Sequence, residues 1–374
     1  MEKEKKVEYV ELIYDLIFVY IIGRNNSLIH SVSGGFIPLN TYLTYILCTL
    51  IVIQIWSFTT LYINRYGTNG IAEHIAMFVN MYLLYYMAEG TRRDWQDYFY
   101  SYNAAWMLIL LNLALQYYLK YRHWEKSKTR ELENLKNNMY LLLILAGIVL
   151  IGIPVYALTG IPLSPLAMAA GVVLTVGSFR FLPVVVPIDF PHLTERVMLY
   201  VVFTFGEMVI TVAGYFEEGF SFQEVYFSAM AFLIVIGLFI SYEYVYDHIL
   251  DREMTTTGVG FVTIHIFLIV GLNNLTTALE FMHEPEVDLV KKNIFLVGSF
   301  LMYYLFLFLM NLYARKERRA DRRLYLWLTG FTVLFSVLMI LLYQNSWLSI
   351  AVTVIFVFAV YGLQIHYRKR RSVL

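Results

Sequence analysis

The chain has 374 residues, of which 59% are hydrophobic and 15% are charged, and its formal net charge is zero. Soluble globular domains carry about 25% charged residues, so this composition excludes a soluble protein and predicts an all-α, polytopic protein of the lipid bilayer. The neutral balance gives no reason to expect a nucleic-acid partner. The one cysteine, Cys48, excludes an internal disulfide and any multi-cysteine metal site.

Twelve segments approach the length of about 20 mostly apolar residues that a membrane-spanning helix needs. We therefore predict one membrane domain, 1–374, with about twelve transmembrane helices and no cleavable signal peptide. The predicted spans are 8–29, 41–63, 71–90, 100–119, 139–158, 165–185, 193–214, 222–246, 256–279, 293–313, 323–343 and 347–367.

The distribution of Lys and Arg predicts the orientation of these spans. With the N-terminus in the cytoplasm, the inner segments hold 21 of the 28 basic residues, and the outer segments hold four. Cytoplasmic segments of membrane proteins carry an excess of Lys and Arg. We therefore expect a multi-pass protein of the cell membrane with both termini in the cytoplasm.

A weak internal similarity indicates a parallel repeat of six plus six helices, with halves 1–187 and 188–374. The segment that begins at Asp15 resembles the one that begins at Glu207, and His74 corresponds to His265. Parallel repeats of this kind occur in transporters. The predicted depth of Glu207 along its helix differs from that of Asp15, which argues against the repeat.

The first apolar segment carries acids on one helical face. Glu8, Glu11 and Asp15 are spaced i, i+3 and i+7. A carboxylate at the centre of a membrane helix costs roughly 2.5–3.5 kcal/mol on insertion scales. We therefore expect Asp15 to face protein or water and to have a partner.

Arginines on other helices supply candidate partners at the same depth. Arg65 and Arg196 lie at the inner ends of their spans, and Arg180 lies about one turn and a half from the inner end of its own. We predict a buried cluster of Glu11 and Asp15 with some of these arginines. Alternatively, the charge pairs only fix the register of the helices.

Further polar residues are candidates of lower specificity. Glu207 is an intramembrane acid that needs a partner, whereas a lone intramembrane histidine is more often a hydrogen-bonded structural residue than a proton relay. The secondary candidates are Asn64, His192, Glu195, His74 and His265. No metal site and no cofactor are expected, because no known nucleotide, hydrolase or metal motif is present.

Three stretches in order carry these charges: VELIYDLIFV from Val10, WSFTTLYINRYGT from Trp56 and HLTERVMLYVVFTFGEMVI from His192. Together they resemble motifs of the bacterial low-temperature-requirement A (LtrA) family, whose members are multi-spanning inner-membrane proteins. The matching positions are Glu11, Asp15, Asn64, Arg65, Thr68, His192, Glu195, Arg196, Gly206 and Glu207. The family name refers to growth in the cold, and no substrate follows from it.

Three functions are consistent with these features. The leading hypothesis is a secondary transporter or channel for a small solute or ion, with Asp15 or Glu207 as a coupling acid. The second is a non-transporting membrane sensor or assembly factor in which the cluster is structural. An intramembrane enzyme is the third and least supported. The sequence leaves open whether the chain forms a homo-oligomer.

Overall fold

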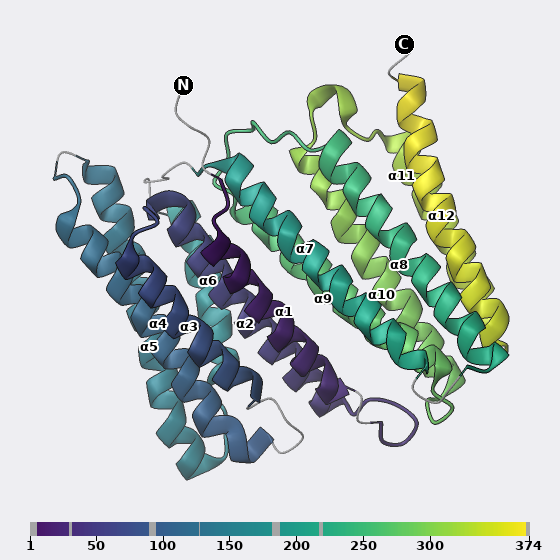
Figure 1. Ribbon diagram of the computed structural model, residues 1–374, viewed down its shortest axis with the longest axis horizontal. Coiled ribbons are helices and arrows are strands. Elements are labelled where there is room, and N and C mark those ends of the chain that lie inside the picture. The colour runs from purple at the N-terminus through teal and green to yellow at the C-terminus, as the bar shows by residue number, and fades with distance from the viewer. Residues whose placement is uncertain are drawn as a thin grey trace. The chain divides into compact units, whose positions relative to one another are not determined.

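A computed structural model of the chain describes residues 6–29, 32–89, 95–126, 128–181, 188–216 and 220–371, and within these ranges it contains α-helices and short 3₁₀ turns but no β-strand (Figure 1). The α-helices are α1 Tyr9–Ile29, α2 Leu39–Tyr66, α3 Ile71–Glu89, α4 Trp95–His123, α5 Thr129–Thr159, α6 Ser164–Phe181, α7 Phe190–Ala213, α8 Phe222–His248, α9 Val259–His283, α10 Leu289–Leu309, α11 Arg322–Leu341 and α12 Ser346–Arg371.

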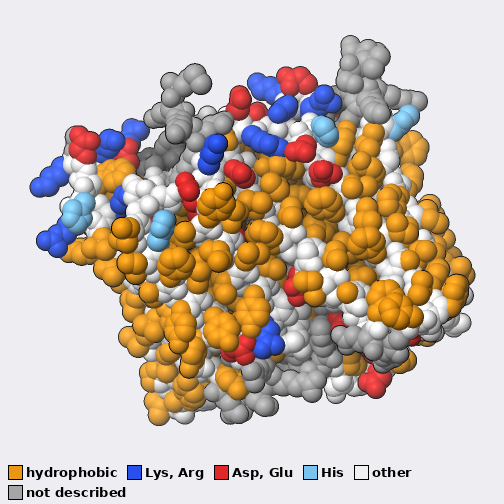
Figure 2. All heavy atoms as spheres, in the orientation of Figure 1, with side chains coloured by type: hydrophobic (Ala, Val, Ile, Leu, Met, Phe, Trp, Pro, Cys, Tyr) orange, Lys and Arg blue, Asp and Glu red, His pale blue; other side chains and the backbone are white. Residues whose placement is uncertain are grey.

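Within the described ranges, nine of these helices are long and apolar enough to cross a membrane: α1, α2, α5 and α7 to α12. Hydrophobic side chains cover the flanks of the helices over most of the face in Figure 2, and charged side chains gather near helix ends. The predicted all-α, multi-spanning membrane fold is therefore confirmed. The count of twelve spans stays a prediction.

The chain forms two compact units. The first comprises residues 1–29, 39–200 and 255–262, and the second comprises 30–38, 201–254 and 263–374. In the first unit α4 packs against α3 and α5, α1 packs against α2 and α3, and α2 packs against α6. In the second unit α12 packs against α8 and α11, and α10 packs against α11. The predicted halves, 1–187 and 188–374, stay a prediction.

Helix α2 of the first unit is largely buried. In its most apolar window, 83% of the residues are buried, compared with 28% for α5. A helix that is covered on all sides presents its polar groups to protein rather than to lipid. The side chains of Trp56, Thr59 and Asn64 on α2 are therefore available as partners for polar groups on neighbouring helices.

Helix α1 has one face toward protein and one away from it. Glu11, Tyr14, Asp15 and Phe18 are buried, with the i, i+3, i+4, i+7 spacing of a single helical face. The opposite face exposes apolar side chains: Tyr9, Ile13, Leu16 and Tyr20. The acids of α1 thus point into the first unit, as the cost of placing them in lipid requires.

Candidate functional site

A buried ion pair joins α1 to α7 inside the first unit. Arg196 Nη2 lies 2.5 Å from Asp15 Oδ1, and Arg196 Nε donates to Asp15 Oδ2 over 3.3 Å. Both side chains are fully buried. The two-point contact fixes the plane of the guanidinium against that of the carboxylate.

Glu11, one helical turn before Asp15, binds the other side of the same guanidinium. Arg196 Nη1 lies 3.2 Å from Glu11 Oε2, and His192 Nε2 lies 3.3 Å from the same oxygen. His192 and Arg196 are four residues apart and share one face of α7. Arg196 therefore bridges the carboxylates of Glu11 and Asp15, and His192, one turn earlier on α7, contacts the Glu11 carboxylate.

Trp56 of α2 completes the environment of Asp15. Its indole Nε1–H donates to Asp15 Oδ1 over 2.8 Å, and the Arg196 guanidinium carbon lies 5.9 Å from the centre of its ring. Tyr200 packs against the same indole, with ring centroids 4.9 Å apart. Asp15 thus receives hydrogen bonds from two residues, and aromatic rings exclude water from them.

Asn64, two turns after Trp56 on α2, holds the start of α7 in place. Its Nδ2 donates to the Asp189 carbonyl over 2.8 Å, and its Oδ1 accepts from the Asp189 N–H over 3.0 Å. The second hydrogen on Nδ2 faces His192 Nδ1 at 3.1 Å. Because that ring nitrogen accepts, the network places the imidazole proton on Nε2, toward Glu11.

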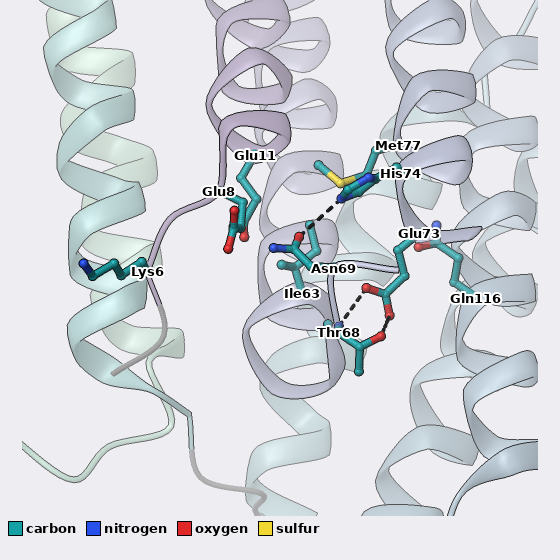
Figure 3. A pocket seen from close by; sticks show the side chains of 11 residues that line it. Lys6, Glu8, Glu11, Ile63, Thr68, Asn69, Glu73, His74, Met77 and Gln116 are labelled. Atoms are coloured by element: carbon teal, nitrogen blue, oxygen red, sulfur yellow. Dashed lines mark hydrogen bonds between the residues drawn. The ribbon is translucent and has the colours of Figure 1, made fainter. Parts of the chain in front are cut away.

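A pocket of about 510 Å³ opens beside this cluster, and Glu11 forms part of its wall. The pocket lies in the first unit, where the start of α1 meets the turn between α2 and α3 (Figure 3). The turn residues Thr68 and Asn69 bond to the first turns of α3. Glu73 accepts from the Thr68 N–H at 2.7 Å and from its hydroxyl at 3.0 Å, and His74 Nε2 lies 3.4 Å from Asn69 Oδ1.

A family model described as bacterial low temperature requirement A protein (LtrA) matches residues 6–360 of this chain. The chain belongs to the LtrA family. The matched range includes the whole cluster: Glu11, Asp15, Trp56, Asn64, His192 and Arg196. No curated protein and no solved structure matches the chain.

The other predicted site residues of this LtrA protein lie in several places. His74 lines the pocket, and Glu195 is exposed on α7 beside the buried Arg196. Arg65 is half-buried in the last turn of α2. The side chain of Arg180 lies outside the described residues. Membership of Arg65 and Arg180 in the cluster stays a prediction.

Glu207 and His265 belong to the second unit. Glu207 is half-buried on α7, and a role for it in a pathway stays a prediction. His265 of α9 is buried, and its Nε2 lies 3.3 Å from the Tyr242 hydroxyl of α8. This contact is typical of a hydrogen-bonded structural histidine.

Sequence reasoning missed Trp56 and Asp189 as members of the cluster. A signal for Trp56 was present, because an indole N–H inside a membrane helix needs an acceptor. Asp189 contacts Asn64 through its backbone, and its side chain accepts from the His192 N–H over 3.0 Å at the start of α7. An Asp directly before a helix is a recognisable capping signal, but the sequence does not reveal the backbone contact with Asn64. Among the described residues, no group of three or more His, Cys, Asp or Glu side chains is arranged to hold a metal ion.

Proposed function

We propose that this LtrA protein is a secondary transporter or channel for a small solute or ion. The observation that carries the proposal is the double position of Glu11: it lines a pocket of about 510 Å³ and also contacts Arg196, which binds Asp15. An ionisable group in a membrane helix that borders a cavity is a common feature of transport pathways.

In this proposal the pocket is the chamber that admits the solute, and Glu11 is the group whose charge responds to it. A cation near Glu11 competes with Arg196 and His192 for the same oxygen, Oε2. Asp15 remains bound to Arg196 and Trp56 during this exchange. The exchange of partners at Glu11 supplies a link between occupancy of the pocket and the contact between α1 and α7.

The proposal includes twelve spans with both termini in the cytoplasm. Helices α3 and α6 have 19 and 18 residues, which at 1.5 Å per residue gives about 28 and 27 Å, near the thickness of the hydrocarbon core. Helix α4, with 29 residues, packs between α3 and α5. The pocket would then open toward the cytoplasm, since the first turn of α1 lines it.

Flux into proteoliposomes under imposed pH and ion gradients tests transport. We expect gradient-dependent flux that is lost in Glu11→Gln and kept in Glu125→Gln, whose side chain is exposed and lies outside the pocket. Absence of flux under every gradient, with correctly folded protein, would contradict the proposal.

A separate experiment tests the orientation. Cys48 is replaced, and single cysteines are placed at Glu125, which we expect inside, and at Glu286, which we expect outside. Labelling by an impermeant maleimide then shows which side of the membrane each position faces.

One observation favours a second function, a membrane sensor or assembly factor with a structural cluster. Asp15 and Arg196 are both fully buried, and neither lines the pocket. Such a buried pair can fix the register of α1 against α7 without any role in transport. A protein that folds normally but shows no flux, and in which Glu11→Gln changes only stability, would favour this function.

A further inference from the structure

The wall of the pocket at the start of α1 carries a carboxylate without a partner among the described residues, that of Glu8, directly before the helix. Glu8 and Glu11 both line it, and Figure 3 shows their side chains next to each other. Glu11 is engaged by Arg196 and His192. The half-buried carboxylate of Glu8 has no hydrogen-bond or ion-pair partner among the described residues, although the Glu8 carbonyl accepts from the Glu11 and Leu12 N–H groups.

A second polar group in the pocket wall lacks a partner. Gln116 of α4 is 7% exposed, and its Nε2 makes no hydrogen bond within the described part of the chain. A buried amide donor without a partner costs about 1–3 kcal/mol, and it lines the pocket. A ligand with an acceptor atom at this position would remove that cost.

The neighbouring groups limit what the acceptor can be. Glu73 lies beside Gln116 in Figure 3, accepts from Thr68 and pairs with Lys120 at 3.5 Å. A ligand carboxylate here would face a protein carboxylate, so the acceptor is a neutral oxygen. Ile63 and Met77 supply apolar wall, which suits a short hydrocarbon stem.

The size of the pocket argues against a bare metal ion. Its volume of about 510 Å³ is far larger than the roughly 10–15 Å³ that a cavity needs to hold one water. The described residues also contain no cluster of three metal-ligating side chains. The chemistry instead matches an organic ion with a positive end and a neutral polar end.

We propose that the pocket binds a small organic ammonium ion that carries a neutral hydroxyl or carbonyl oxygen, such as an amino alcohol. The ammonium group pairs with Glu8 beside Glu11, and the neutral oxygen accepts from Gln116 Nε2. This assignment names the substrate class of the transporter and so rests on the proposed function, but binding itself is measurable without transport.

The test is the thermal midpoint of the purified full-length protein in detergent, titrated with 3-aminopropan-1-ol hydrochloride. A ligand that binds the folded state raises the midpoint in a saturable way. Propan-1-ol lacks the charge, propylammonium lacks the oxygen, and sodium chloride controls for ionic strength. We expect stabilisation by the amino alcohol, weaker stabilisation by propylammonium and none by the other two.

Variants assign the two contacts separately. We expect Glu8→Gln to weaken binding of both ammonium ions about tenfold, while Glu125→Gln, an exposed acid outside the pocket, leaves it unchanged. Gln116→Leu should weaken the amino alcohol to the level of propylammonium. Lys6→Glu, at an exposed position that lines the pocket, should tighten both. Equal binding by wild type and Glu8→Gln, or equal stabilisation by propan-1-ol, would overturn the proposal.

Flux of the radiolabelled amino alcohol into proteoliposomes separates the two proposals. Binding without flux would overturn the transport function and keep the ammonium site. Flux of another solute, together with no ammonium binding by the wild-type protein, would overturn the ammonium site and keep transport.

Discussion

Arg196 of α7 and Asp15 of α1 lie 181 residues apart in the sequence, and their side chains meet at 2.5 Å with no exposure to solvent. The same guanidinium reaches Glu11 at 3.2 Å. One cation therefore serves two carboxylates, and the consequences of removing the cation and of removing one acid differ.

We expect Arg196→Gln to destabilise the protein more than Asp15→Asn. The first leaves two buried carboxylates without the cation and should cost about 3–5 kcal/mol, whereas the second leaves Arg196 paired with Glu11. Thermal midpoints and reversible unfolding in mixed detergent measure both. The double variant should cost less than the sum of the single ones. Glu195→Gln, at the exposed neighbouring position, is the control, and an equal loss there would contradict the assignment.

Trp56→Phe should cost about 1–3 kcal/mol, because it removes the indole donor of the 2.8 Å bond to Asp15 and keeps most of the ring. Trp106 offers a matched control on α4. It is also fully buried, but its Nε1 has no hydrogen-bond partner among the described residues. Trp106→Phe should therefore cost less in the same unfolding measurement. A larger loss at Trp106 would show that ring volume rather than the hydrogen bond dominates.

Asn64→Leu should destabilise the start of α7, because it removes both bonds to the Asp189 backbone and the contact with His192 Nδ1. We expect a loss of about 2–3 kcal/mol and faster amide exchange at residues 189–193. Asn137→Leu is the control, because Asn137 lies on α5 and outside the cluster. Unchanged exchange at 189–193 in Asn64→Leu would contradict the role.

Gly67→Ala should disturb the turn between α2 and α3 that lines the pocket. A Cβ at Gly67 would lie 2.5 Å from the Ile63 carbonyl oxygen, which is backbone and cannot move aside. Gly147 in α5 has open space around its Cβ position, so Gly147→Ala should be neutral or stabilising by about 0.5–1 kcal/mol. Ammonium binding and thermal midpoint measured on both variants check this. An undisturbed midpoint in Gly67→Ala would show that the turn can relax.

Part of the site could be predicted from the sequence, because placing a charged side chain in an apolar membrane helix is energetically costly. Glu11, Asp15 and Arg196 stand out because charged groups are expensive in an apolar helix, and all three lie in one cluster in the first unit. Period and hydropathy likewise predicted a helical, multi-spanning fold. The sequence places these charges at one depth but does not give the distances between the helices.

The missing parts depend on three-dimensional contact. In the sequence Gln116 is one of several amides within apolar segments. The observation that makes it informative, a donor that lines a pocket without a partner among the described residues, requires coordinates. The contact of Asp189 with Asn64 uses the Asp189 backbone atoms, which carry no sequence signal. Arg65, Arg180 and Glu207 satisfy the same cost argument as Arg196, so sequence alone could not rank them.

The separation of Asp15 from Arg196 has a consequence for biosynthesis. A ribosome that adds about 5–20 residues per second needs roughly 10–40 s to make the intervening 181 residues. During that interval α1 has left the ribosome with two acids and without the guanidinium that neutralises them. The nascent helix must therefore be held by water, headgroups or the insertion machinery, and nascent chains that stop before α7 should be preferred substrates for membrane proteases.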